Sequence, residues 1–325
     1  MMEQSAHFDL AQAQLKKLLQ QIETVIKGKR SSIELILTCL LAQGHVLLED
    51  NPGTGKTVMA RSLANAIKAD GKTVFKRVQF TPDLLPMDLV GSFVYDDNIK
   101  EFVFKKGPIF TNILLADEIN RASPKVQSAL LECLAEGQVS AGDHTYKLDQ
   151  LFFTIATQNP IEMEGTYPLP AAQLDRFSMK ISFGYADESS ELDILKNYQQ
   201  IHADLHKQDN DAISIDDVMM MQTVCGNVHI HDHLIQAVHN ILLATRQHPN
   251  ITLGASTRAG INFIKCLKAY AFIQNRNYII ENDIANLIVP CLQHRMIFKN
   301  NFQSDEILHD LLHIEIKKLN QLSIH

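Results

Sequence analysis

Short apolar runs alternate with amphipathic segments through the first half of the chain. Each run has the length and the apolar content of a buried parallel strand, and helical or inserted segments separate one run from the next. Alternation of this kind predicts an α/β fold in which helices cover both faces of a parallel sheet. The five predicted strands are residues 45–49, 74–80, 112–117, 152–157 and 179–183.

The pattern changes beyond Gly184, where the strand-like runs end and helical periodicity continues. We therefore predict an α/β core over residues 1–186 and a helical domain over residues 187–325. The length of 325 residues supports this division, because it exceeds the usual size of one compact core. The segment from Ser304 onward mixes helical and extended character, so its structure stays open. The predicted helices of the second domain are residues 190–198, 215–222, 232–247, 256–273 and 283–295.

Two insertions interrupt the predicted α/β core, near residues 81–104 and 138–150. Within the first insertion, the apolar segments 93–95 and 102–104 predict the two strands of a hairpin. We expect both insertions to serve function rather than architecture.

A glycine-rich loop directly follows the first predicted strand and opens a helical pattern. In this context the N–H groups of the loop and of the helix N-terminus point at phosphates, Lys56 supplies a cation for the β- and γ-phosphate oxygens, and Thr57 offers a hydroxyl to Mg²⁺. Asp50 stands where the usual pattern has glycine, and a simple tight turn is the alternative interpretation. The candidate nucleotide-binding residues are Asn51, Pro52, Gly53, Thr54, Gly55, Lys56, Thr57 and Val58.

Two adjacent carboxylates, Asp117 and Glu118, end the third predicted strand. Ligands of open α/β sheets bind at the carboxyl edge of the strands, where these side chains are expected. Asp117 can hold Mg²⁺ directly or through water, and Glu118 can polarise the water that attacks the terminal phosphate. A solvated strand end is the alternative, but the phosphate loop upstream favours the catalytic pair.

Composition and charge narrow the classes of function. Hydrophobic content of 46% and charged content of 21% are ordinary for a globular protein. A formal net charge of −7 argues against a broad nucleic-acid-binding face, although a ring-shaped assembly could still concentrate Lys and Arg locally. Nucleic acid is therefore not the expected partner.

The cysteines are odd in number, widely spaced and mostly set in apolar helical patterns, which predicts buried thiols in a reducing compartment. The N-terminus lacks a basic region followed by an apolar core, and no apolar run approaches the ~18 residues that a membrane span needs. We therefore expect a cytoplasmic protein without a membrane span. The cysteines are Cys39, Cys133, Cys225, Cys266 and Cys291.

A cluster of Cys225, His229, His231, Asp232 and His233 has the composition of a metal site. Its spacing does not favour that interpretation, because alternate residues of an extended segment point to opposite faces. Asp232 fits the N-cap of the following helix instead.

Taken together, the motifs resemble those of the MoxR group of AAA+ ATPases, and the resemblance covers nearly the whole chain. Asp50 is also common at its position in that group. The resemblance implies a P-loop AAA+ core with a five-stranded parallel sheet, followed by an all-α lid domain. The residues that carry it are 47–57, 81–91, 115–122, 156–160, 164–170, 174–177 and 254–259.

The resemblance implies further catalytic residues. Asn159 matches the polar residue that contacts the γ-phosphate and orients water together with Glu118. Arg176 matches the arginine finger that reaches the nucleotide of the neighbouring subunit. Arg258 resembles the lid arginine that touches the nucleotide and couples hydrolysis to movement of the helical domain. For an isolated arginine, an ion pair is the alternative.

Other residues lie where this group surrounds the base or the subunit interface. Val25, Ile26 and Gly28 match the segment that wraps the adenine. Whether Arg121 acts across the interface stays open. The preference for ATP over GTP rests on the resemblance alone.

The function implied is Mg²⁺-dependent ATP hydrolysis in a homo-oligomeric ring, most simply a hexamer, that drives chaperone-like remodelling, maturation or cofactor or metal insertion of a partner protein. The resemblance suggests a partner with a von Willebrand factor A domain. Three alternatives stay open: a motor stimulated by nucleic acid, a nucleotide-dependent binding switch that hydrolyses slowly, and the motor subunit of a metal chelatase.

Overall fold

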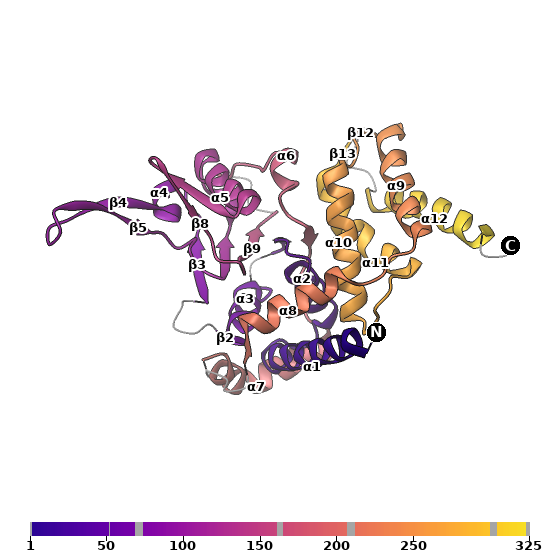
Figure 1. Ribbon diagram of the computed structural model, residues 1–325, viewed down its shortest axis with the longest axis horizontal. Helices are drawn as coiled ribbons and strands as arrows, with labels where there is room; N and C mark the ends of the chain where they lie inside the picture. The colour runs from indigo at the N-terminus through magenta and orange to yellow at the C-terminus, as the bar shows by residue number, and fades with distance from the viewer. Residues whose placement is uncertain are drawn as a thin grey trace.

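A five-stranded parallel sheet organises the first half of the chain in the computed structural model, which describes residues 2–51, 53–68, 74–160, 165–206, 212–299 and 304–322 (Figure 1). The strand order is β10-β1-β9-β6-β3, with every neighbouring pair parallel. The predicted parallel sheet is thus confirmed. Its strands are β1 (Val46–Glu49), β3 (Phe75–Gln79), β6 (Ile113–Asp117), β9 (Phe153–Gln158) and β10 (Met179–Ile181).

Alternation of side chains along the strands divides the core into two clusters. Leu48 of β1 and Leu115 of β6 join one cluster, whereas their neighbours Leu47 and Leu114 join the other. This is the period-two pattern of a strand that is buried on both faces. The first cluster packs on α1 (Met2–Val25), α2 (Arg30–Leu41) and α3 (Lys56–Asn65), and the second on α4 (Pro86–Val90) and α5 (Pro124–Glu136).

The start and end of α5 follow from its sequence. Ser123 is the N-cap, Pro124 occupies the first helical position, and Gly137 closes the helix in the left-handed conformation with φ of 62°. Proline suits the first turn because no intrahelical partner exists there for its missing N–H, and glycine adopts positive φ without a steric penalty. The helix returns the chain across the sheet after the acidic end of β6.

Both insertions form antiparallel hairpins. The first pairs β4 (Gly91–Asp96) with β5 (Glu101–Lys106), and the second pairs β7 (Gln138–Ala141) with β8 (His144–Lys147). The two hairpins touch where Phe104 stacks on Tyr146, with ring centroids 4.3 Å apart. Figure 1 shows β4 and β5 projecting away from the rest of the molecule.

The second half of the chain is mainly helical. The segment from Ser304, which the sequence left open, forms a helix. Two short strand pairs accompany the helices: β2 (Ile67–Lys68) with β11 (Ile213–Ser214), and β12 (Ile251–Leu253) with β13 (Ile297–Phe298). The helices are α7 (Glu188–His206), α8 (Ile215–Gly226), α9 (Asp232–Gln247), α10 (Thr257–Ile273), α11 (Glu281–Leu292) and α12 (Ser304–Leu322), preceded by the short α6 (Ala171–Leu174).

The helical half packs on the N-terminal helices through a continuous apolar cluster. Phe8 of α1 meets Phe272 of α10 edge to face at 5.5 Å, and Gln12 donates to the carbonyl of Phe272 at 2.6 Å. Because this cluster joins residues from both halves, packing alone does not mark a boundary, and the division after residue 186 stays a prediction.

The structure also shows the environment of the cysteines and of the candidate metal cluster. All five cysteines are buried and free. Among the described residues, no group of three or more His, Cys, Asp or Glu side chains is arranged to hold a metal ion. His231, rather than Asp232, is the N-cap of α9, and its side chain accepts from the N–H of His233. None of the described helices is long and apolar enough to cross a bilayer.

Candidate active site

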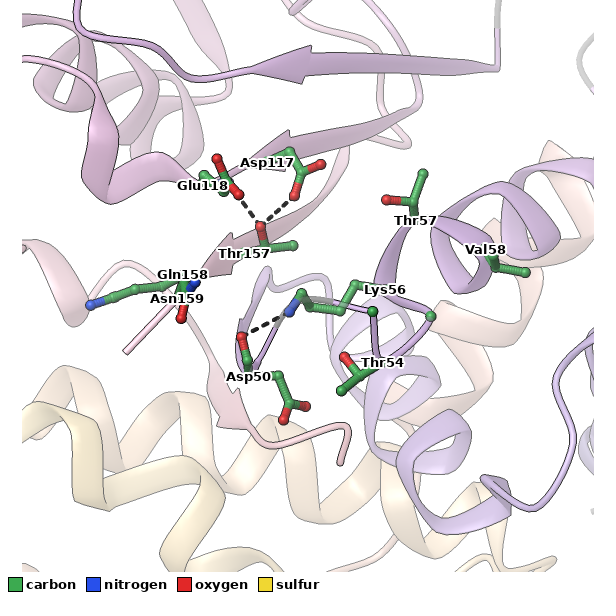
Figure 2. A pocket seen from close by; sticks show the side chains of 12 residues that line it. Asp50, Thr54, Lys56, Thr57, Val58, Asp117, Glu118, Thr157, Gln158 and Asn159 are labelled. Carbon is green, nitrogen blue, oxygen red and sulfur yellow. Dashed lines mark hydrogen bonds between the residues drawn. The ribbon is translucent and has the colours of Figure 1, made fainter. Parts of the chain in front are cut away.

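A cavity of about 350 Å³ lies at the carboxyl edge of the sheet, where the loop after β1 faces the ends of β6 and β9 (Figure 2). The register explains this convergence, because Gln79 of β3 pairs with Asp117, and Glu49 of β1 pairs with Gln158 of β9. Parallel strands in that register deliver their last side chains to one edge. The lining residues are Asp50, Gly53, Thr54, Gly55, Lys56, Thr57, Val58, Asp117, Glu118, Thr157, Gln158 and Asn159.

The phosphate loop turns sharply into α3. Gly55 is the N-cap of that helix with φ of 93°, a backbone conformation that L-residues with a side chain rarely adopt. Lys56 donates to the carbonyls of Asp50 at 2.9 Å and Asn51 at 2.8 Å. Burial lowers the pKa of Lys56, and Asp50, Asp117 and Glu118 partly offset that effect. The loop therefore presents one cation and the N-terminal end of a helix to the cavity.

Thr157 of β9 holds the acidic pair in place. Its hydroxyl donates to Oδ1 of Asp117 at 2.6 Å and accepts from the N–H of Glu118 at 2.8 Å. Figure 2 shows both contacts, with Lys56 on the opposite side of the cavity. Thr157 is 1% exposed, so its two hydrogen bonds are shielded from water. One hydroxyl thereby fixes the position of the side chain that could bind Mg²⁺ and the backbone of the residue that could polarise water.

Side chains of β3 approach the same carboxylates from the outer strand. Arg77 donates to Oδ2 of Asp117 from Nε at 3.1 Å and from Nη2 at 2.7 Å. Gln79 donates to Oε2 of Glu118 at 2.7 Å, and Arg121 donates to the same oxygen at 2.9 Å. Glu118 itself has φ of 56°, an unusual conformation for a residue with a side chain. Each carboxylate thus has a defined orientation.

Asn159 lies at the end of β9, is 6% exposed and lines the cavity together with the phosphate loop. Gln158 precedes it on the same wall. Asn159 therefore lines the same cavity as Lys56, Thr57, Asp117 and Glu118. Pro52, which the sequence also assigns to the nucleotide, lies outside the described residues.

A second cavity, of about 290 Å³ and mainly apolar, adjoins the first and shares Gly53, Thr54, Gly55 and Val58 with it. Val25 and Ile26 line this cavity, as do residues at the start of α7. Gly28 is not among the lining residues but packs closely on α7. A Cβ there would lie 2.4 Å from the hydroxyl of Ser190. Asn51 lines neither cavity, and its carbonyl instead accepts from Lys56.

Arg176 and Arg258 lie together elsewhere. They line a polar cavity of about 190 Å³ that shares no lining residue with the two cavities at the phosphate loop. Asp175 and His45 also line it. Within this chain, therefore, neither arginine lines the cavities that the phosphate loop forms.

Three side chains that contact the acidic pair had no role predicted for them from the sequence: Arg77, Gln79 and Thr157. Thr157 is the last residue of one predicted strand and Gln79 the last but one of another, and this position near a strand end was the available signal. Their partners depend on the strand order, which a pattern of apolar runs does not specify. The sequence shows that Asp50 stands where the usual loop has glycine, but it does not show which groups the Asp50 side chain contacts.

Comparison with known proteins relates this arrangement to a family. Residues 45–179 match the ATPase family associated with various cellular activities (AAA), and residues 243–311 match the AAA lid domain. The chain is 37% identical to the chaperone MoxR1 of Mycobacterium tuberculosis over 302 residues, which cover 90% of this chain and 78% of that protein. This chain is an AAA+ ATPase of the MoxR family.

The chain is also similar to two further relatives and to a solved structure. The uncharacterized protein YeaC of Bacillus subtilis is 47% identical over 283 residues, 87% of either chain. The protein MoxR of Paracoccus denitrificans is 26% identical over 307 residues, covering 86% of this chain and 87% of that one. A solved structure of a protein from Cytophaga hutchinsonii superposes with a TM-score of 0.85 at 37% identity over 95% of this chain and 96% of that one. The MoxR protein described here accordingly binds nucleotide and hydrolyses ATP.

Proposed function

We propose that this MoxR protein hydrolyses ATP in a Mg²⁺-dependent reaction at the cavity between the phosphate loop and the acidic end of β6. The observation that carries the proposal is the contact of the Thr157 hydroxyl with the carboxylate of Asp117 and with the N–H of Glu118, which places both acidic residues on the cavity that Lys56 lines. Lys56 would neutralise charge on the β- and γ-phosphates, and Glu118 would orient and polarise the attacking water. Asn159 would contact the γ-phosphate and report its presence.

The residues present fit Mg²⁺ and a triphosphate. Thr57 and Asp117 offer oxygen atoms to the same cavity, and oxygen ligands are those that Mg²⁺ prefers. Gly53, Thr54 and Gly55 line the wall beside the N-terminus of α3, where helix geometry favours an anion. Bound Mg²⁺ would neutralise charge that develops on the transferring phosphoryl group.

The adjoining apolar cavity is the proposed adenine site. Val25 and Ile26 supply apolar surface for a base, and the shared wall from Gly53 to Val58 places that surface beside the phosphates. Gly28 would act indirectly, because its lack of a side chain allows the segment after α1 to approach Ser190 of α7. We propose ATP rather than GTP on the basis of family membership.

We further propose that Arg176 and Arg258 act on the nucleotide of a neighbouring subunit in a hexameric ring. They line one cavity together, and that cavity is distinct from those of the phosphate loop in the same chain. Arg176 would stabilise negative charge in the transition state, a contribution of about 10³ or more in rate for arginine fingers in general. Arg258 would couple hydrolysis to the position of the helical domain.

The work done by hydrolysis is proposed to be chaperone-like remodelling or maturation of a partner protein, with a von Willebrand factor A domain as the suggested partner module. The β4–β5 hairpin supports a contact with another protein, because it projects from the core (Figure 1) and carries exposed apolar side chains. These are Phe93, Val94, Tyr95, Phe102 and Val103.

Phosphate release from purified protein tests the catalytic part of the proposal. We expect ATP hydrolysis that requires Mg²⁺, stops in EDTA and falls at least about 100-fold in Glu118→Gln, which should still bind ATP. Hydrolysis that persists in EDTA, or that Glu118→Gln leaves unchanged, would contradict it. Addition of DNA or RNA should not stimulate the rate, and a salt-sensitive stimulation would favour a nucleic-acid motor instead.

A further inference from the structure

The carboxylate of Asp50 contacts the segment that joins β10 to α7. Its Oδ2 accepts from the N–H of Phe183 and from the N–H of Gly184, the latter at 2.6 Å. Asp50 is 8% exposed, so these charge-assisted hydrogen bonds lie within the protein. The glycine that usually stands at this place in a phosphate loop has no side chain and cannot make them.

Lys29 holds the same two residues by their carbonyl groups. Its ammonium donates to the carbonyl of Phe183 at 2.7 Å and to that of Gly184 at 2.5 Å, and it lies 5.1 Å from the centre of the Phe183 ring. Lys29 is also 8% exposed. A buried anion therefore binds the donors of this short segment, and a buried cation binds its acceptors.

The backbone of Asp50 belongs to the phosphate site. Its carbonyl accepts from Lys56 at 2.9 Å, and its N–H donates to the carbonyl of Gln158 at 3.2 Å. Figure 2 shows the carboxylate of Asp50 pointing away from Lys56. A triphosphate that attracts Lys56 competes with the carbonyl of Asp50 for the same ammonium. Movement of the Lys56 ammonium therefore changes a contact of Asp50, and the side chain of Asp50 in turn holds the backbone of Phe183 and Gly184.

The segment that contains Phe183 and Gly184 leads directly into α7, the first long helix of the helical half. Gly184 has φ of 64°, and three residues later Asp187 accepts from the N–H of Ser190 at 3.0 Å in the first turn of α7. Tyr185 of the segment lines the proposed adenine cavity. Residues 183–187 therefore connect the phosphate loop, the base cavity and the start of α7.

We propose that Asp50 is a positioning residue that couples the phosphate loop to the helical half of the protein through Phe183 and Gly184. The inference rests on the proposed nucleotide site. Binding of a nucleotide shifts the contact between Lys56 and Asp50, and the carboxylate transmits that shift to the segment before α7. By reciprocity, the position of α7 alters how the loop holds the phosphates.

Hydrogen exchange of the full-length protein tests the coupling without requiring hydrolysis. The probe is a non-hydrolysable ATP analogue, and the signals are the amides of Phe183 and Gly184. In the wild type we expect the analogue to change their exchange rates by about 10-fold, the size of a typical coupling between sites. In Asp50→Gly both amides should exchange faster, and the analogue should no longer change their rates.

Steady-state kinetics separate positioning from folding. Asp50→Gly restores the usual loop pattern, so we expect KM for ATP within about threefold of the wild type but kcat lowered about 10-fold. Asp50→Asn keeps one acceptor oxygen and should retain an intermediate kcat. Ser182→Ala is the matched control, because that hydroxyl is 3.4 Å from Oδ1 of Asp50 and the two backbone contacts remain.

The outcomes distinguish the coupling from the proposed function. The coupling would be overturned, even if ATP is hydrolysed, by either of two results. The analogue could leave the exchange rates of the Phe183 and Gly184 amides unchanged in the wild type, or it could change them equally in the wild type and in Asp50→Gly. Loss of analogue binding in both Asp50 variants would also overturn the coupling, because the Asp50 side chain would then be needed for nucleotide binding itself. A wild type that binds the analogue, shows the exchange response and fails to hydrolyse ATP would retain the coupling and reject the proposed reaction.

Discussion

Arg77 and Asp117 form an ion pair across two neighbouring parallel strands, with Nη2 of the arginine 2.7 Å from Oδ2 of the aspartate. The arginine side chain is 46% exposed, whereas the aspartate side chain is 11% exposed. Asp117 therefore presents one oxygen to Arg77 and the other to the hydroxyl of Thr157. If Asp117 binds Mg²⁺ as proposed, the metal ion lies close to the positive charge of Arg77.

Removal of that charge should strengthen Mg²⁺ binding. In Arg77→Gln we expect the Mg²⁺ concentration for half-maximal ATPase activity to fall about threefold to tenfold, because a cation beside the metal site no longer opposes Mg²⁺ and solvent screening keeps the effect small. Titration of Mg²⁺ at saturating ATP measures it. Arg77→Lys is the control that keeps the charge. A rise in the Mg²⁺ requirement of Arg77→Gln would show that the arginine supports the metal site rather than competing with it.

Thr157→Val should disturb the carboxylate of Asp117 and the backbone of Glu118 while preserving the shape of the side chain at position 157. The substitution leaves the N–H of Glu118 and one oxygen of Asp117 without their partner, which should lower the free energy of unfolding by about 1–3 kcal/mol and reduce kcat. Thr157→Ser retains the hydroxyl and should keep most of the activity. Urea unfolding and phosphate release measure the two effects. Equal activity of the Val and Ser variants would exclude the role assigned to this hydroxyl.

Buried His45 makes stability depend on pH. Its Nδ1 accepts from the N–H of Thr154 at 3.1 Å, so Nε2 carries the proton and donates to the carbonyl of Leu134 at 3.2 Å. Burial lowers the pKa of His45 to about 4. Between that value and the unfolded-state pKa near 6.5, the unfolded chain binds more protons than the native one. Stability should therefore fall as the pH falls through this window.

The contribution of His45 can be isolated by substitution. Between pH 7 and pH 5, the histidine should account for about 2 kcal/mol of lost stability, because each pH unit inside the window corresponds to about 1.4 kcal/mol. His45→Gln cannot titrate and should lose correspondingly less over the same interval. Urea unfolding at both pH values provides the comparison. An identical loss in wild type and variant would mean that His45 does not titrate as assigned.

The parts of the site that depend on local sequence could be predicted, whereas those that depend on strand order could not. The loop around Lys56 and the strand ending in Asp117 carry local signals, namely glycines before a helix and an apolar run before two acids. The contact of Arg77 with Asp117 requires β3 to lie beside β6, an adjacency that the apolar pattern leaves open. The same holds for Asp50, whose partners lie more than 130 positions along the chain.

Long-range packing also explains why the sequence left the segment from Ser304 open whereas the structure shows a helix there. The segment from Ser304 carried mixed local signals, and its buried positions become clear only against α9 and α11, where Leu308 is fully buried. Arg176 and Arg258 could be identified by resemblance, but their shared cavity follows from the packing of the helical half on the end of the sheet. Their action on a neighbouring subunit stays a prediction.

A mixing experiment tests the central claim, a catalytic site completed by the neighbouring subunit, most directly. Glu118→Gln and Arg176→Ala should each hydrolyse ATP at least about 100-fold more slowly than the wild type while still binding it. In randomly mixed rings, about a quarter of the interfaces would combine an intact Glu118 with an intact Arg176 from the adjacent subunit. We predict that an equimolar mixture regains activity well above either variant alone. A mixture that forms joint oligomers but stays as inactive as its components would contradict the shared site.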